Sequence, residues 1–280
     1  MGEVAAAGGE LVGTSVEPAG TRRGWKRVAE SASPLLLVLA LVAVWEAAVR
    51  GFEIQRFLLP APSEVARLIV EEWPLIQMHS LQTIGSILTG YAAAAVFALA
   101  VSALMIRFRI AERLIMPIFV GLQSVPKIAI APLILVWVGA GPTSKVLVVA
   151  SIAFFPIVIN TMTGFHEVDR GLRDVFRSVA ATERQTFFRL RLPYAVPYIF
   201  AGLRIATTLA VLGAIVAEWL AASNGLGYLV LSGSFNFNTA RSFAAIIALA
   251  VIGTAFFTLM SSLERLIVWR RDPGDATTNI

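Results

Sequence analysis

The sequence predicts an all-α membrane protein, built as a bundle of six transmembrane helices. Of its 280 residues, 57% are hydrophobic and 15% are charged, whereas a soluble domain has roughly half apolar and about a quarter charged residues. Six apolar runs follow one another along the chain, and a transmembrane helix needs about 17–25 mostly apolar residues. These runs lie at residues 34–49, 84–106, 114–138, 146–162, 196–222 and 243–268.

The first 33 residues are unlike the rest. They are rich in Gly, Ala and Ser and end in a basic cluster around Trp25, which predicts a disordered arm that leads into a membrane-surface anchor. The pair Arg22–Arg23 before an apolar run resembles a twin-arginine export signal. Five further apolar runs instead favour a retained first transmembrane helix.

The basic residues predict the orientation of the bundle. With a cytoplasmic N-terminus and six spans, sixteen of the 23 Lys and Arg residues fall in cytoplasmic segments and five in outer segments. The sixteen are Arg22, Arg23, Lys26, Arg27, Arg107, Arg109, Arg113, Arg170, Arg173, Arg177, Arg184, Arg189, Arg191, Arg265, Arg270 and Arg271; the five are Arg50, Arg56, Arg67, Lys145 and Arg241. This positive-inside bias predicts a multi-pass bacterial inner-membrane protein with both termini in the cytoplasm. It also explains the net charge of +5 without a nucleic-acid partner.

An outer segment around residues 57–73 predicts a short helix on the membrane surface. Ser63 stands where a helix N-cap is expected, and Val65, Leu68, Ile69 and Trp73 fall on one helical face. The surface helix and the first span together make up residues 34–78.

The residues give little support to an enzyme. The chain has no cysteine and only two histidines, His79 and His166, which the predicted topology places on opposite sides of the membrane. We therefore expect no metal site. The stretch 139–145 lacks the spacing of a phosphate-binding loop and sits in a short turn between helices, so we expect this chain to bind no nucleotide.

The long loop before the fifth apolar run predicts two short helices outside the membrane. Leu172, Val175, Phe176 and Val179 share one helical face. Thr182 and Gln185 have the spacing of a capping box, which starts a second helix after the small pair Ala180–Ala181. That helix carries Phe187, Phe188 and Leu190 on an apolar side, and Pro193 is expected to end it. Such a helix pair either rests on the lipid surface or docks a soluble partner.

This loop resembles the E-A-A motif of binding-protein-dependent ABC importer permeases, in which E-A-A is followed by three residues, Gly, nine residues and I-x-L-P. Asp174-Val-Phe176 stands at E-A-A, Ala180 at the glycine, and Leu190 to Pro193 at the end. The stretches 123–141, 154–169, 192–206 and 216–230 resemble the nitrate, sulfonate and taurine branch of that family. The resemblance covers residues 79–268, and leaves 269–280 as a cytoplasmic tail.

The resemblance implies a type I ABC importer permease fold and a division of labour between chains. A cytoplasmic ABC ATPase, which binds ATP and magnesium, docks on the loop; the coupling residues are Asp174, Ala180, Ala181, Thr182, Gln185, Phe187, Phe188, Leu190 and Pro193. An external binding protein delivers the substrate, and two permease copies pair within the lipid. The stretches 125–133, 224–231 and 235–246 look most like the subgroup for thiamine-pyrimidine precursors or riboflavin, with sulfonate, taurine and nitrate as alternatives.

Polar residues at membrane depth are candidates for the translocation path, because such residues usually face water or a bundle interior. Lys127 follows Pro126 inside the third apolar run, where a broken helix is expected; its alternative is a structural pair. Arg204 is expected to extend towards the cytoplasmic surface. Glu218 either lines the path or faces the outer vestibule, and Glu46 lies near the end of the first run. The path candidates are Gln123, Ser124, Lys127, Asn160 and Glu218. A stand-alone channel or secondary transporter remains the alternative function.

Overall fold

The computed structural model describes residues 21–221 and 223–268, and side chains from residue 36 onward apart from Arg109 and Ala221. All regular structure within these residues is helical, as the sequence predicts. The chain forms two compact units, Met1–Glu53 and Ile54–Ile280, which are described separately.

The first unit holds one described helix, α1 (Thr21–Gly51). It contains the first predicted apolar run, and the described side chains from Leu36 to Leu41 are exposed. Because α1 begins at Thr21, the predicted disordered arm is helical from that residue on; residues 1–20 lie outside the described part of the chain. Glu46 forms an ion pair of 2.6 Å with Arg50 one turn later.

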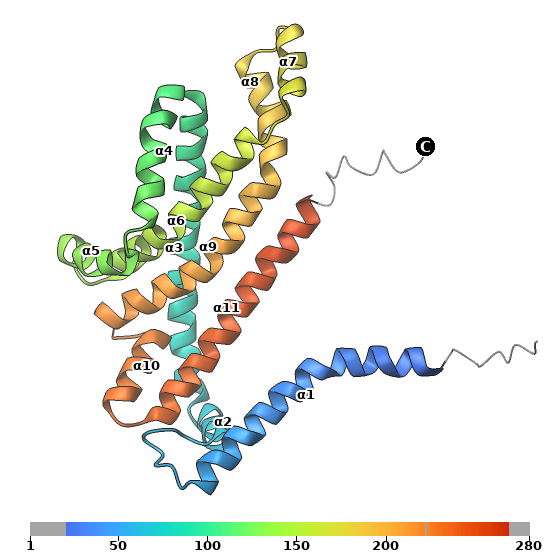
Figure 1. Ribbon diagram of the computed structural model, residues 1–280. Coiled ribbons are helices and arrows are strands. Elements are labelled where there is room, and N and C mark those ends of the chain that lie inside the picture. The colour runs from blue at the N-terminus through green and yellow to red at the C-terminus, as the bar shows by residue number, and fades with distance from the viewer. Residues whose placement is uncertain (1–20, 222, 269–280) are drawn as a thin grey trace, which may run out of the picture. The chain divides into compact units, whose positions relative to one another are not determined.

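The second unit carries the rest of the predicted bundle (Figure 1). Its elements are α2 (Pro62–Glu71), α3 (Trp73–Arg107), α4 (Arg109–Gln123), the 3-10 turn η1 (Lys127–Ile130), α5 (Ala131–Val138), α6 (Pro142–His166), α7 (Arg170–Ser178), α8 (Glu183–Thr186), the π-helical turn η2 (Phe187–Arg191), α9 (Leu192–Ala221), α10 (Leu226–Phe235) and α11 (Thr239–Val268). Helices α7 and α8 lie at one end of the unit, and α2 and α10 lie at the other.

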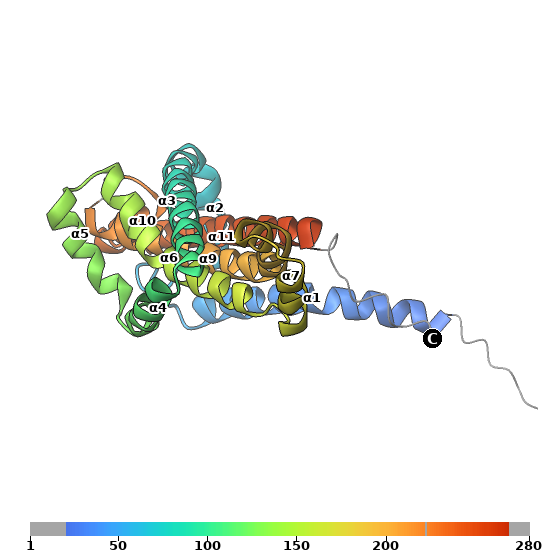
Figure 2. The ribbon, with the colours of Figure 1, turned by 90° about the horizontal axis from the view of Figure 1, so that it is seen from above.

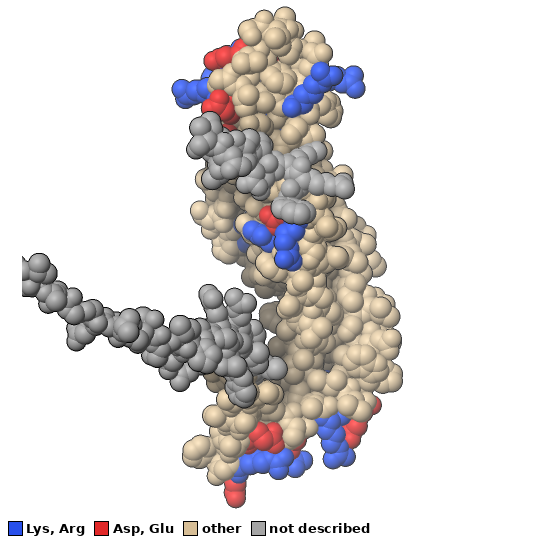
Figure 3. Space-filling model, turned by 90° about the vertical axis from the view of Figure 1, so that its right-hand side faces the viewer, with Lys and Arg blue, Asp and Glu red and all other residues tan. Residues whose placement is uncertain are grey.

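Four stretches of the described chain are long and apolar enough to cross a membrane: α3, α6, the continuous helix Glu183–Leu220, and α11. A fifth span is obtained if α4 and the η1–α5 segment, bent by 96° at their junction, count as one. The sixth predicted span, the apolar run at residues 34–49 in α1, is not among these stretches and stays a prediction. Figure 3 shows charged side chains at both ends of the visible face and in one cluster between; the described surface below that cluster is uncharged, as lipid contact requires.

Helix α2 confirms the predicted short amphipathic helix and corrects its start. Val65 is buried, and Leu68 and Ile69 pack in a cluster with residues of α10 and α11. The N-cap is Ala61 and the helix begins at Pro62, two residues earlier than an N-cap at Ser63 predicts. Proline suits a first helical position because its missing N–H has no acceptor there.

The core of the unit is α6, which packs against α9 and α3. Their backbones approach closely because glycines and alanines line the contacts. A Cβ atom on Gly90 of α3 would lie 2.4 Å from Val149 of α6, and one on Gly213 of α9 would lie 2.9 Å from the same residue. Small residues of this kind are the usual contact between membrane helices, whose association relies on close van der Waals packing. Figure 2 shows α5 reaching to one side of these core helices, away from α7.

The start of α10 is held by three side chains from other helices. The backbone N–H groups of Gly225, Leu226 and Gly227 donate hydrogen bonds of 2.8 Å to His79 Nδ1, Thr83 Oγ1 and a Glu218 carboxylate oxygen, respectively. These are among the N–H groups that a helix N-terminus leaves without an intrahelical acceptor. Thr83 also donates to Glu218 at 2.8 Å, so α3, α9 and α10 meet in one buried network.

We predict that Gly225→Ala destabilises the protein, whereas Gly85→Ala does not. Gly225 has a φ of +106°, and an added Cβ would lie 2.2 Å from Glu218 Cδ; backbone strain of this kind costs about 1–3 kcal/mol. Gly85 lies in α3 with open space around its Cβ position. Thermal unfolding of the purified variants measures the difference, and equal melting temperatures would contradict the arrangement described for this turn.

Candidate functional site

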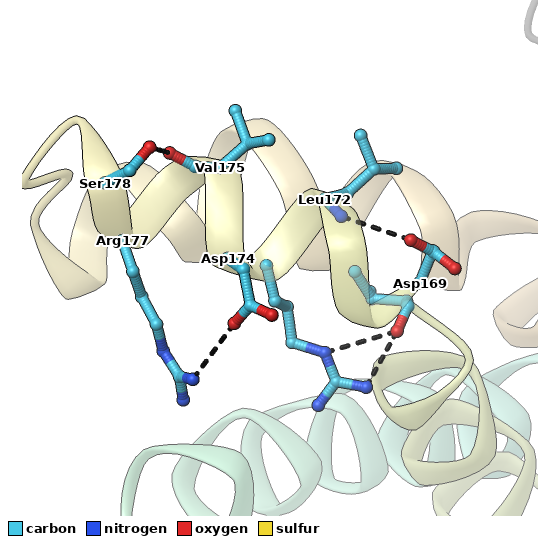
Figure 4. Close-up of polar contacts among 8 residues, drawn as sticks. Asp169, Leu172, Asp174, Val175, Arg177 and Ser178 are labelled. Carbon is cyan, nitrogen blue, oxygen red and sulfur yellow. Dashed lines mark hydrogen bonds and ion pairs between the residues drawn. The ribbon is translucent and has the colours of Figure 1, made fainter.

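Helix α7 is fixed at its start by two local contacts. Asp169 is its N-cap and accepts a hydrogen bond of 3.1 Å from the backbone N–H of Leu172. The guanidinium group of Arg173 donates to the carbonyl oxygen of Val168 at 2.7 Å. Both contacts join α7 to the segment that follows α6 (Figure 4). They fix the start of α7 relative to the end of α6.

The two faces of α7 differ in chemistry. Figure 4 shows Leu172 and Val175 pointing to one side, while Asp174 and Arg177 lie on another. Asp174, the predicted coupling acid, forms an ion pair of 3.3 Å with Arg177, and both side chains are largely exposed. An exposed pair of this kind contributes little to stability, so these charges remain available to a partner.

The turn between α7 and α8 is centred on Ala180, in the position that the E-A-A motif gives to glycine. Ala180 has a φ of +52°, the left-handed conformation that disfavours a side chain. The N–H of Ala180 bonds to the carbonyl of Arg177, and that of Ala181 bonds to the carbonyl of Phe176, each at 3.0 Å. The backbone thus keeps the turn that glycine would make without strain.

The predicted capping box is confirmed. Thr182 Oγ1 accepts from the Gln185 N–H at 3.2 Å, and the Thr182 N–H donates to Gln185 Oε1 at 2.8 Å. The predicted stop at Pro193 is wrong. Helix α8 continues through the π-helical turn η2 into α9, and Pro193 is the second residue of α9. Because a π turn shifts the hydrogen-bond register, the chain accommodates a residue without an N–H and continues into the membrane span.

The prediction of an exposed patch formed by Phe187, Phe188 and Leu190 is also partly wrong. Leu190 is buried, with 4% of its surface exposed, and Phe187 packs against Phe165 with ring centroids 5.5 Å apart. Phe188 alone of the three is exposed, at 56%. The other exposed apolar side chains of this region belong to α7 and its end: Leu172, Val175 and Val179. We define these four residues as the apolar docking face.

The break predicted near Pro126 is confirmed, and it carries three of the path candidates. Gln123 ends α4, Ser124 follows it, and Lys127 begins η1 after Pro126. Lys127 is half-buried, and its Nζ atom lies 5.1 Å from the centroid of the Phe155 ring on α6, within the range of a cation–π interaction. No carboxylate pairs with Lys127 in the described part of the chain.

The remaining polar candidates make contacts inside the bundle. The side-chain amide of Asn160 donates a hydrogen bond of 2.8 Å to the carbonyl oxygen of Pro156. Pro156 is a proline inside helix α6. Arg204 forms an ion pair of 2.9 Å with Glu264, near the end of α11; its extension towards the cytoplasmic surface stays a prediction. Glu218 is 1% exposed and belongs to the network at α10, so it does not line an open vestibule in this conformation.

A second site lies at the α10 end and was not predicted. A cavity of about 790 Å³ is lined mainly by hydroxyl, amide and small side chains. Its lining residues are Leu81, Gln82, Gly85, Ser86, Thr89, Ala140, Gly141, Pro142, Thr143, Lys145, Val146, Ser223 and Asn224. Lys145 donates to Asn224 at 2.8 Å. Ser86 and Thr89 of α3 are spaced three apart and share a helical face, which was the available signal.

The two histidines lie apart, as the sequence predicts. His79 is buried at the start of α10, and His166 ends α6 beside Glu112. Within the described residues, no group of three or more His, Asp or Glu side chains is placed to hold a metal ion.

The chain is similar to known membrane transport proteins. Residues 86–269 match the family described as the binding-protein-dependent transport system inner membrane component. The chain is 36% identical over 248 residues to the formylaminopyrimidine transport permease protein ThiX of Halalkalibacterium halodurans, covering 88% of this chain and 99% of that protein. It is 36% identical to the riboflavin transport system permease protein RibX of Chloroflexus aurantiacus (84% and 88% covered). It is 32% identical to the putative aliphatic sulfonates transport permease protein SsuC of Bacillus subtilis (95% and 97% covered).

Solved structures show the same fold. The chain superposes on an inward-facing structure of the MetNI methionine ABC transporter with a TM-score of 0.62, at 18% identity, covering 70% of this chain and 97% of that one. A crystal structure of an amino acid ABC transporter with histidines gives a TM-score of 0.57 at 18% identity, covering 72% and 96%. The fold is therefore that of a type I importer permease.

We predict that substitutions at Ala180 act through its backbone conformation. Ala180→Gly removes the left-handed strain and is expected to retain function with stability equal or higher by up to about 1 kcal/mol. Ala180→Val adds a β-branched side chain that disfavours this φ, and is expected to lower stability and transport together. Melting temperatures and uptake in cells carrying each variant test this; an Ala180→Val variant as active as Ala180→Gly would contradict the assignment of the turn.

Proposed function

We propose that a cytoplasmic ATPase drives this protein through the apolar docking face. The premise is that the chain belongs to the family of binding-protein-dependent transport system inner membrane components and is therefore the permease subunit of an ABC importer. Family membership implies an ATPase and a substrate-binding protein as partners. ATP and magnesium bind to the ATPase in this proposal, and this chain supplies the path and the mechanical link.

The exposure of the docking face is the observation that carries the proposal. Leu172, Val175, Val179 and Phe188 are each more than a third exposed, on a helix pair that lies beyond the ends of the membrane helices α3 and α6 (Figure 1). Apolar residues exposed together and bordered by charges are typical of a protein interface. The lipid surface is the alternative occupant.

The geometry also supports a route for the force. Helices α7 and α8 are joined to α6 by the short segment 167–169 and to α9 by the continuous η2 turn. A displacement of α7 therefore passes directly into two helices that pack closely on each other. Such coupling through rigid elements moves the bundle between outward and inward access. The broken α4–η1–α5 segment and Lys127, which we propose as part of the path or its gate, lie against α6.

Orientation, membrane and substrate complete the proposal. The positive-inside bias supports a bacterial inner membrane with both termini and α7 in the cytoplasm, and two copies are proposed to pair in the lipid. The named relatives transport a pyrimidine, riboflavin or aliphatic sulfonates, so we propose a small organic or anionic solute. A stand-alone channel or secondary transporter would need no ATPase, and copurification with one separates the two functions.

We predict that Val175→Asp and Ala181→Glu leave the protein inserted in the membrane but weaken ATPase binding by about 2 kcal/mol or more, the range for an interface anchor. Val175 is 56% exposed, so a charged side chain at this position is not buried in the hydrophobic core and should not lower the stability of the fold. Arg67→Gln, at the opposite end of the unit, is the matched control. Pull-down of the ATPase with membranes from each variant, together with cellular uptake, gives the answer; full ATPase retention by both variants would restore the lipid-surface interpretation.

We predict that Lys127→Met lowers transport while ATPase binding survives. The substitution keeps the side-chain length and its contact with Phe155 but removes the charge, so a role in the path is separated from packing. Uptake and pull-down are measured on the same membranes. Unchanged uptake would remove Lys127 from the mechanism, and loss of ATPase binding would favour a structural role.

A further inference from the structure

A basic cavity lies beside α7, at the ends of two membrane helices. It has a volume of about 260 Å³ and is lined by residues of α3, α4, α6, α7 and η2. Its charged lining residues are Glu112, Arg113, His166, Arg173 and Arg191. Three guanidinium groups therefore face one carboxylate in a space formed by five elements.

Within the described residues, the one carboxylate that lines this cavity does not neutralise its positive charge. Glu112 is already engaged, because its Oε1 lies 2.6 Å from His166 Nε2. Arg173 binds the Val168 carbonyl, which is a neutral acceptor. Within the described part of the chain, the side chains of Arg113 and Arg191 have neither a hydrogen bond nor an ion pair. The forked guanidinium group matches phosphate geometry with paired hydrogen bonds, so the arrangement fits a phosphate group.

The position of the cavity indicates where such a phosphate comes from. Ile106 and His166, which line it, stand at the ends of the membrane-crossing helices α3 and α6, at the depth of lipid headgroups. Basic pockets between membrane helices at this level bind anionic headgroups. A neighbouring hollow of about 570 Å³ shares Glu112, His166 and Arg173 and is largely polar; Glu167, Asp169 and Arg170 line it beside Met116 and Met162, so the acyl chain is not placed there. On α4, Ile110, Leu114 and Ile118 are exposed at intervals of four residues, which gives an apolar stripe for an acyl chain.

We propose that this cavity binds the phosphate group of an anionic phospholipid and that the bound headgroup links α4, α7 and η2. Free inorganic phosphate has the same chemistry and is the alternative source. The site is separate from the apolar docking face, because its Arg173 guanidinium folds back onto the segment preceding α7. The lipid thus braces the base of the helix pair while the docking face stays available.

The test uses the purified, delipidated transporter complex in detergent. Its melting temperature is measured against short-chain phosphatidylglycerol, short-chain phosphatidylcholine and inorganic phosphate. Phosphatidylglycerol is expected to raise the melting temperature, and phosphatidylcholine, whose headgroup carries no net charge, is expected to do so far less. Arg113→Gln and Arg191→Gln should each weaken the apparent affinity for phosphatidylglycerol about tenfold, through loss of a charge-assisted contact.

Two further variants distinguish the outcomes. Arg191→Lys keeps the positive charge but loses the forked guanidinium group, and it should bind phosphatidylglycerol with intermediate affinity. Arg67→Gln on α2 removes one exposed charge elsewhere and should bind phosphatidylglycerol like the unmodified chain. A phosphate-induced shift that both glutamine variants lose supports the site with free phosphate as its ligand. Equal lipid affinity in all variants overturns the proposal. So does weaker ATPase pull-down by Arg113→Gln and Arg191→Gln with lipid binding intact, which would assign the arginines to the ATPase interface.

Discussion

Close packing of α6 against α9 is the constraint on which the other features depend. Buried alanines of α6 and α9, including Ala153, Ala206 and Ala210, and the close approach of Gly213 to Val149 bring the two backbones together. The helix pair α7–α8, which carries the apolar docking face, connects α6 to α9. The contact between α6 and α9 therefore sets its position. Interfaces packed this tightly move as units rather than deforming gradually. In the proposed mechanism, a displacement of α7 is therefore transmitted to the membrane helices α6 and α9 as a whole.

Local features of the docking element could be predicted from the sequence because each depends on residues close together in the chain. The capping box needs only Thr182 and Gln185, the turn only small residues at 180–181, and the first helix only the apolar spacing from Leu172 onward. The break after α4 follows in the same way from Pro126. These local features do not depend on the tertiary structure, because their hydrogen bonds form between residues within one or two helical turns.

The rest depends on partners that are distant in the chain. Glu218 looked like a path residue because an acid at membrane depth is usually functional, but Thr83, 135 positions away, donates a hydrogen bond to it within a buried network. Leu190 looked exposed because it follows two aromatics among arginines, yet only 4% of its surface is exposed in the folded chain. Pro193 looked like a stop because helix propensity disfavours proline, and the preceding change of register overrode it. For Glu218 and Leu190 tertiary contact decided the outcome, whereas for Pro193 the register change in the adjoining η2 turn did.

The π-helical turn η2 has a consequence for how such docking elements diverge. A π turn holds one residue more than an α turn, and one residue corresponds to a rotation of about 100° around a helix axis. Residues 187–191 therefore set the rotation of α8 about the helix axis relative to α9. Insertion or deletion of a single residue there would swing Phe188 around the axis while leaving α9 in its place in the bundle. Relatives with the same membrane core can in this way present differently aimed surfaces, and under the proposed function such a change would alter which ATPase fits without repacking the spans.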